Sequence, residues 1–157
     1  MANQTSSLAS RSVEIRDIRY VIRKIPAVKA KKIIDDKDEI GVLSAVEVDG
    51  VSLENEYLID KFLPDWEVMD ELISIASLYN FEFLESWKPV RFPASMACNY
   101  NPSECKYIDA IFSSLISSNM ATLNELKTGY SLEDAFQLLE VLTVTRVNEF
   151  KAHEAAK

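Results

Sequence analysis

The sequence is poor in the residues that most catalytic and metal sites require. Among 157 residues it has one histidine and two cysteines. His153 lies in the last turns before the end of the sequence, where a helix frays and cannot hold a general base in fixed geometry. Cys98 and Cys105 have no nearby histidine or second cysteine pair, so we read them as free thiols. We therefore expect no enzyme, no metal and no cofactor.

Glycine is also scarce, with only Gly41, Gly50 and Gly129 in the chain. A loop that cradles phosphate needs several glycines because its backbone amides must approach the anion closely, so this class of site is excluded. The acidic run at residues 35–39 lacks the glycine and the alternate ligand spacing of a calcium loop. It is better interpreted as a solvated helix end.

Long apolar runs are missing. The longest uncharged stretch, residues 110–124, is interrupted by serines and an asparagine, and it is shorter than the roughly 20 apolar residues of a membrane span. Residues 1–10 have neither the basic nor the apolar segment of a signal peptide, which predicts a flexible arm on an intracellular protein. Residues 11–157 suffice for one globular domain, and no membrane contact is expected.

The charge is plentiful and unevenly placed. The chain carries 25 acidic and 17 basic residues, a net charge of −8. Residues 11–32 hold eight basic and two acidic side chains, whereas residues 33–71 hold thirteen acidic and two basic ones. Residues 122–142 could form a helix-turn-helix, but its second helix would present Glu133, Asp134 and Glu140 to phosphates. No nucleic-acid binding is therefore predicted.

The N-terminal part, residues 11–53, predicts strands mixed with one helix. Alternation of apolar and basic residues over 13–25 indicates a half-buried strand or hairpin. Pro26 suits the start of a short helix over 27–34, whose apolar face would be Val28, Ile33 and Ile34. At residues 40–53 the Asp49-Gly50 pair favours a hairpin, although residues 40–46 also fit a buried helical turn.

The C-terminal part, residues 54–157, predicts helices. A short helix should run from Ser52 or Asn55 through Phe62, and Asp65 should open another that stops at Asn80. Its inward face is predicted from spacing. The residues of that face are Trp66, Met69, Ile73, Ala76 and Tyr79. Prolines and aromatic rings at 81–102 predict an extended connector packed by its rings.

Three more helix starts follow the connector. Ser103-Glu104 should cap a helix with an apolar face at 3.6-residue spacing. That face comprises Tyr107, Ile108, Ile111, Phe112, Leu115 and Ile116. Thr122 to Glu125 and Ser131 to Asp134 have capping-box spacing, the first helix stopping at Gly129 and the second running to Phe150 or beyond. The fold class is therefore α+β and predominantly helical: a short N-terminal strand or hairpin region, then a helical C-terminal half.

Three short stretches of the sequence resemble known proteins. Residues 20–30, YVIRKIPAVKA, and the endings 121–126, ATLNEL, and 130–141, YSLEDAFQLLEV, are similar to small tail assembly chaperones of tailed bacteriophages. The resemblance implies a non-catalytic factor in the host cytoplasm. Such a factor binds the tape measure protein and keeps it soluble during tail assembly. It could act as a single chain or as a homo-oligomer.

The surface that would bind this protein partner is inferred from amphipathic spacing. Its first candidates lie on the last helix, and two residues near the start of the 65–80 helix are a second choice. These residues are Phe136, Leu139, Leu142, Val147, Phe150, Trp66 and Met69. Plain core packing is the alternative reading for each of them. Two other functions fit the same features: a structural or connector protein of the virion, and a small acidic inhibitor of a host defence protein.

Overall fold

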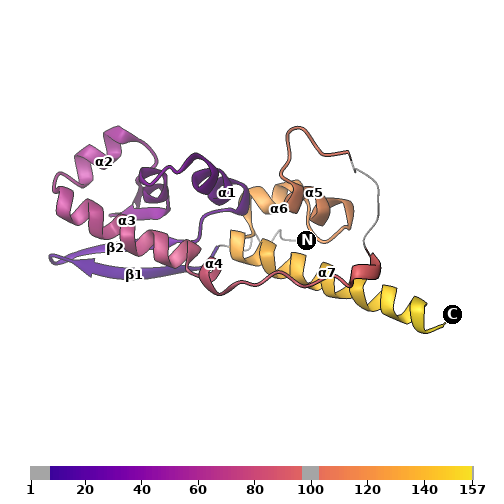
Figure 1. The fold of residues 1–157 in the computed structure, drawn as a ribbon. Coiled ribbons are helices and arrows are strands. Elements are labelled where there is room, and N and C mark those ends of the chain that lie inside the picture. The colour runs from indigo at the N-terminus through magenta and orange to yellow at the C-terminus, as the bar shows by residue number, and fades with distance from the viewer. Residues whose placement is uncertain (1–7, 97–102, 157) are drawn as a thin grey trace, which may run out of the picture.

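The structure is a computed structural model that describes residues 8–96 and 103–156. It has an α+β fold dominated by helices, as the sequence predicts. An antiparallel sheet in the order β1-β2-β3-β4 forms the N-terminal part, and α3 lies across it (Figure 1). The remaining large helices gather at the other end of the molecule. No described helix combines the length and apolar character that crossing a membrane requires.

β1 (Ser10–Ile15) and β2 (Ile18–Arg23) form a hairpin, the second of the two structures that the alternation over residues 13–25 left open. Arg16 and Asp17 make its two-residue turn with φ of 50° and 63°, the left-handed conformations that match the twist of the strands. Alternate residues such as Tyr20 are buried, while the arginines of β2 are exposed. Within the stretch 1–10 that was expected to be an arm, Ala9 already accepts a hydrogen bond from the Lys24 N–H, and residues 1–7 lie outside the described chain.

Residues 40–53 contain both of the structures that the sequence left open. η1 (Ile40–Ala45) is the buried helical turn, and β3 (Val46–Val48) with β4 (Val51–Ser52) is the hairpin. Its turn is Asp49-Gly50, with φ of 50° and 77°, where glycine adopts a conformation that other residues rarely reach. The helical turn and the hairpin, which the sequence offered as alternatives, therefore follow one another in this segment.

α1 (Ala27–Asp36) follows Pro26, as predicted, and ends in the acidic run. Its buried face is Ala27, Ala30 and Ile33, so Val28 and Ile34 are only half-buried. The small alanines allow α1 to approach its neighbours α6 and α7 closely.

α2 (Glu56–Phe62) is capped by Asn55, whose side chain accepts from the Leu58 N–H, and Ser52 belongs to β4 instead. α3 (Trp66–Phe81) begins after Asp65, as predicted, and its predicted face is right in part: Ala76 is buried, Met69, Ile73 and Tyr79 are half-buried against the core, and Trp66 is exposed. The helix buries Val68, Leu72, Ala76 and Asn80, one position away from most of the predicted residues. The helix ends at Phe81, one residue beyond the predicted stop at Asn80.

The expected connector at 81–102 is partly helical. α4 (Phe83–Ser86) and the single turn η2 (Ala94–Met96) interrupt it, and residues 87–93 between them are extended. Residues 97–102 lie outside the described chain. The rings do pack at its beginning, where Trp87 and Phe83 contact Phe136.

α5 (Ala110–Ser117) begins later than predicted. Asp109, not Ser103, caps it by accepting from the Ile111 N–H, and Tyr107 is 86% exposed. α6 (Leu123–Thr128) and α7 (Leu132–Ala155) both have the predicted capping boxes, and Gly129 ends α6. One core joins all these elements to the sheet, with Ile22, Leu115 and Leu126 fully buried in it.

Candidate protein-binding surface

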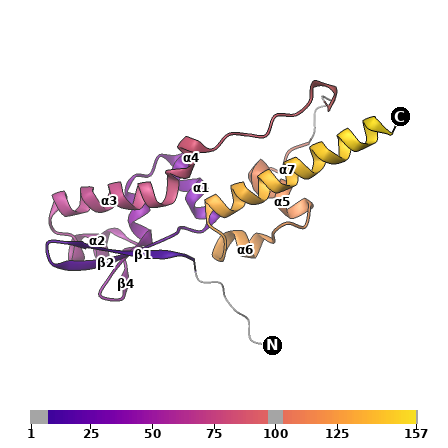
Figure 2. The same cartoon turned by 90° about the horizontal axis from the view of Figure 1, so that it is seen from below.

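The longest helix, α7, projects from the body of the protein. Ser131 Oγ accepts from the Asp134 N–H at 3.2 Å, and the Asp134 carboxylate accepts from the Ser131 N–H at 2.8 Å, which fixes the start of the helix. The helix then runs for 24 residues, about 36 Å at 1.5 Å per residue, without glycine or proline. From residue 148 to 156 every residue except Phe150 is exposed. Both views show this end standing clear of the other helices (Figure 2).

The predicted residue Phe136 is in the core and not on the surface. It is 8% exposed, and two rings meet it edge-on: Trp87 at 4.8 Å and Phe83 at 5.5 Å between ring centroids. Such arrangements are favourable because the positive ring edge meets the negative face. Phe136 could touch a partner only after these rings had moved.

The other predicted residues of α7 lie along one side of the helix, at different depths. Leu139 and Leu142 are half-buried and pack against the core, Val147 is 6% exposed, and Phe150 is half-buried near the projecting end. These residues therefore form one stripe on α7, but most of the stripe is buried within the protein and is not exposed to a partner. Their role as partner contacts stays a prediction.

Two valines that sequence reasoning missed are exposed elsewhere on the same helix. Val141 is 55% exposed and Val144 is 40% exposed. They are three residues apart, so they share one side, and that side lies away from the Leu139 stripe. The signal was in the sequence, because α7 carries apolar residues around more than one face, which a helix with a single buried stripe does not need.

Trp66 and Met69, the second choice, do not act as a pair. Met69 is half-buried against the core, while Trp66 is 70% exposed at the first position of α3. Next to it, the Arg16 guanidinium pairs with Asp65 and, at 2.6 Å, with Glu67. The hairpin tip is thereby held against the start of α3.

Asp65 has a second role as the cap of α3. Its carboxylate accepts from the Glu67 N–H at 2.9 Å. This hydrogen bond, followed by the nearby Arg16 charge, lowers the pKa of Asp65 below its ordinary value. The ionised form is therefore favoured in the fold.

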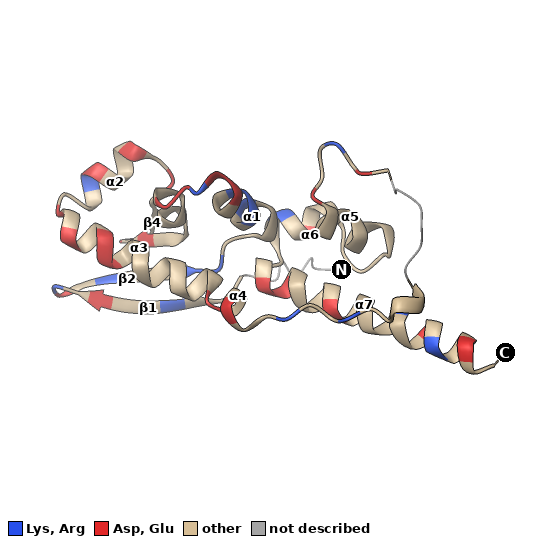
Figure 3. Ribbon diagram, viewed as in Figure 1, with Lys and Arg blue, Asp and Glu red and all other residues tan. Residues whose placement is uncertain are grey.

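The surface around Trp66 is strongly acidic. Acidic residues are concentrated in and near α2 and in the first turns of α3 (Figure 3), and their side chains are exposed. They belong to Glu54, Glu56, Asp60, Glu67, Asp70 and Glu71. Tyr57, which is 73% exposed, is on α2 among them. This end of the molecule offers negative charge together with exposed aromatic rings.

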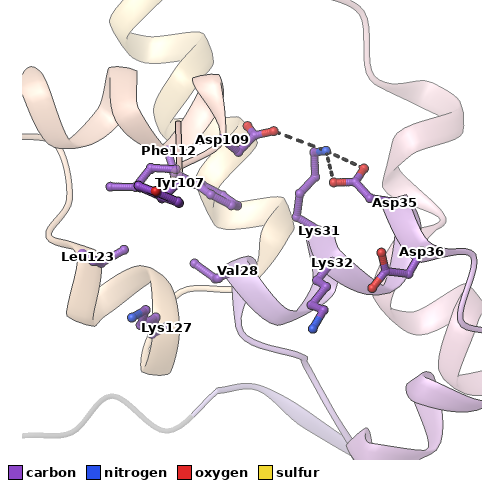
Figure 4. Close-up of a pocket in the computed structure, with 11 residues that line it drawn as sticks. Val28, Lys31, Lys32, Asp35, Asp36, Tyr107, Asp109, Phe112, Leu123 and Lys127 are labelled. Carbon is purple, nitrogen blue, oxygen red and sulfur yellow. Dashed lines mark hydrogen bonds and ion pairs between the residues drawn. The ribbon is translucent and has the colours of Figure 1, made fainter. Parts of the chain in front are cut away.

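A small pocket opens between α1, α5 and α6 (Figure 4). Its volume is about 270 Å³, and its apolar floor includes Val28 and Phe112. Lys31 Nζ donates to Asp35 Oδ1 at 2.6 Å and lies 3.3 Å from Asp109 Oδ2, so three of the six charged residues that line the pocket are paired with each other. The Asp35 hydrogen bond raises the pKa of Lys31. Ligand pockets usually measure about 300–1,000 Å³, so this one is small for a ligand site.

The described residues contain no cluster of three histidine, cysteine or acidic side chains that could hold a metal ion. Cys105 is an exposed free thiol, Cys98 lies outside the described chain, and His153 is exposed in the last turn of α7. Comparisons of the chain with known protein families, curated proteins and solved structures found no match. Function must therefore be argued from the surfaces themselves.

Proposed function

We propose that this chain is a non-catalytic tail assembly chaperone of a tailed bacteriophage. It would bind the tape measure protein in the host cytoplasm and keep it soluble until the tail tube forms. The observation that carries the proposal is the projecting α7, on which Val141 and Val144 stay exposed. The resemblance of residues 20–30, 121–126 and 130–141 to such chaperones supports the same function.

The physical basis is the covering of apolar helix stripes. A long helical client exposes such stripes before it assembles, and an uncovered stripe leads to aggregation. A helix lying along α7 on the side away from the Leu139 stripe would contact Val141 and Val144. The net charge of −8 would keep the complex apart from other copies.

Co-expression tests this function. The client to be tested is any long helical protein whose gene neighbours that of this chain, and the measured quantity is the fraction of client that stays soluble. We expect the wild-type chain to raise this fraction and the double variant Val141→Gln, Val144→Gln to return it to the level without chaperone. Leu78→Gln is the matched control, because Leu78 is an apolar residue of α3 with 57% exposure. If no such neighbour gains solubility, the proposal is wrong.

Purified virus particles give a second test. A chaperone leaves before the particle is complete, so mass spectrometry should not find the chain in virions. A fixed copy number per particle would instead identify a structural or connector protein of the tail.

A second candidate function is favoured by the acidic surface of α2 and α3. Negative charge with exposed rings, Trp66 and Tyr57, suits a partner rich in arginine and lysine, because cations bind both carboxylates and ring faces. This candidate is an inhibitor of a host defence protein that normally binds nucleic acid. Recovery of a basic nuclease from host lysate by the wild-type chain, but not by a Glu67→Lys, Asp70→Lys variant, would favour it.

A further inference from the structure

The first residues of the connector fasten α4 to α7 through aromatic rings. Trp87 lies at 83° to the Phe136 ring, and Phe83 lies at 71° to it. Trp87 packs against the core, whereas most side chains after it are exposed, including Phe92 at 59%. Residues 88–96 run in the same direction as α7 (Figures 1 and 2). Trp87 is therefore the attachment of an otherwise loosely packed segment.

This attachment is incomplete. The Trp87 Nε1–H is buried and has no hydrogen-bond partner among the described residues. A buried donor without an acceptor is unfavourable, because in water it would be hydrogen-bonded. If the Trp87 side chain left the groove, its Nε1–H could form a hydrogen bond with water. The contacts with the Phe136 ring therefore favour the packed position of Trp87, and the unpaired donor disfavours it.

Space remains beside the attachment. A cavity of about 370 Å³ lies between α4, the start of the connector and α7. Phe83, Trp87 and Phe136 form its apolar part, and Gln137 and Glu140 of α7 form its polar rim. Removal of the Trp87 ring would enlarge this cavity over Phe136.

We propose that residues 87–96 are a strap that Trp87 fastens over Phe136 in a groove on α7, and that the strap opens by release of Trp87. In the closed strap Phe136 is covered, and in the open strap it is available to an apolar helix. That the helix belongs to a client of a chaperone rests on the proposed function. The opening of the strap does not depend on the proposed function, and it can be tested without any client.

The first experiment follows hydrogen exchange of the Trp87 indole N–H by NMR. The Trp66→Phe variant is used, since the chain has two tryptophans and this leaves one indole signal. A strap that opens in the folded protein predicts indole exchange about a hundredfold faster than that of the slowest core amides. Exchange as slow as that of the core amides would mean that Trp87 is released only by global unfolding, and would overturn the proposal.

The second experiment removes the attachment in the full chain. Trp87→Ser should leave the far-UV circular dichroism and the cooperative melting in place, and should increase binding of the dye 8-anilinonaphthalene-1-sulfonate about tenfold as the groove opens. Trp66→Ser is the matched control, because Trp66 is 70% exposed and lies away from the groove. Equal dye binding by the two variants, or loss of cooperative melting in Trp87→Ser, would show that Trp87 is only a structural core residue. An open strap with no effect on client solubility would reject Phe136 as a contact of the client and leave the strap itself supported.

Discussion

At the scale of single residues, Asn80 connects the two parts of the fold. Its Oδ1 accepts from the Ile25 N–H at 2.7 Å, and its Nδ2 donates to the Ala76 carbonyl at 3.0 Å. The side chain is 4% exposed, so water does not replace these partners. Asparagine reads as a helix stop in a sequence, but here it satisfies a buried backbone donor where β2 leads into α1.

Asn80→Ala should therefore be strongly destabilising. The substitution leaves the Ile25 N–H buried without an acceptor, and we expect a loss of about 2–3 kcal/mol of unfolding free energy. Urea denaturation measures this loss. Asn148→Ala is the control, because Asn148 is exposed on α7 and its replacement should change stability by less than about 0.5 kcal/mol. Equal effects of the two variants would contradict the role given to Asn80.

Asp65 makes stability depend on pH. Its pKa is lowered in the fold, first by the Glu67 N–H and then by Arg16, from an ordinary value of 3.8. A lowered pKa gives stability that is present above the unfolded value and is lost as pH falls through the folded value. We expect the wild type to lose stability between about pH 5 and about pH 2, and Asp65→Asn to lose less over this range. Asparagine can still cap the helix, so the difference between the two urea titrations isolates the charge. Parallel pH profiles would contradict this.

At the scale of helices and strands, local chemistry could be predicted from the sequence. The capping boxes of α6 and α7 were predicted because each is closed by residues three positions apart. Strand structure at the β1–β2 hairpin was predicted because apolar and basic residues alternate over residues 13–25, although the alternation left a single strand and a hairpin open. Such signals need no knowledge of the neighbouring elements.

Elements whose buried face depends on their neighbours could not be predicted. α3 has apolar residues on several sides, so spacing alone did not decide between the stripe of Met69 and that of Leu72. Contact with η1 and β2 selects the Leu72 stripe. For α5, apolar spacing extended back to Tyr107, but Asp109 offers the capping carboxylate and the helix starts there. The candidate site could be predicted only in part for the same reason. Spacing identified the α7 stripe, but it could not show that the rings of α4 and the connector cover Phe136.

The capping box of α7 allows a prediction about one element. Ser131→Ala removes the acceptor of the Asp134 N–H at a position that is 4% exposed, so we expect a loss of about 1–2 kcal/mol. Thr145→Ala is the control within the same helix, because its exposed hydroxyl only donates to the Val141 carbonyl. Chemical denaturation should find this control within about 0.5 kcal/mol of the wild type. A Ser131 variant as stable as the control would mean that the cap contributes little.

At the scale of the whole molecule, the sheet and the C-terminal helices share one core. Pro26, between β2 and α1, forms a bridge with Ser131, and the Ala27 N–H donates to the Tyr130 carbonyl at 2.8 Å. Lys24 Nζ lies 2.9 Å from Glu133 Oε2, which adds an ion pair at the same junction. These contacts bring the chain just after the hairpin to the start of α7. The two parts that the sequence distinguished, residues 11–53 and 54–157, are therefore expected to unfold together.

Leu115→Ala tests this coupling from the C-terminal side. Leu115 is fully buried in α5, and truncation of a buried leucine costs about 2–5 kcal/mol through lost burial and a residual cavity. If the core is one cooperative unit, native-state hydrogen exchange of the slowest β2 amides should accelerate by the same free energy as that of the α5 amides. Leu78→Ala, at a residue with 57% exposure, should leave both sets within about 0.5 kcal/mol of the wild type. If β2 kept its protection while α5 lost it, the sheet would be an independent folding unit.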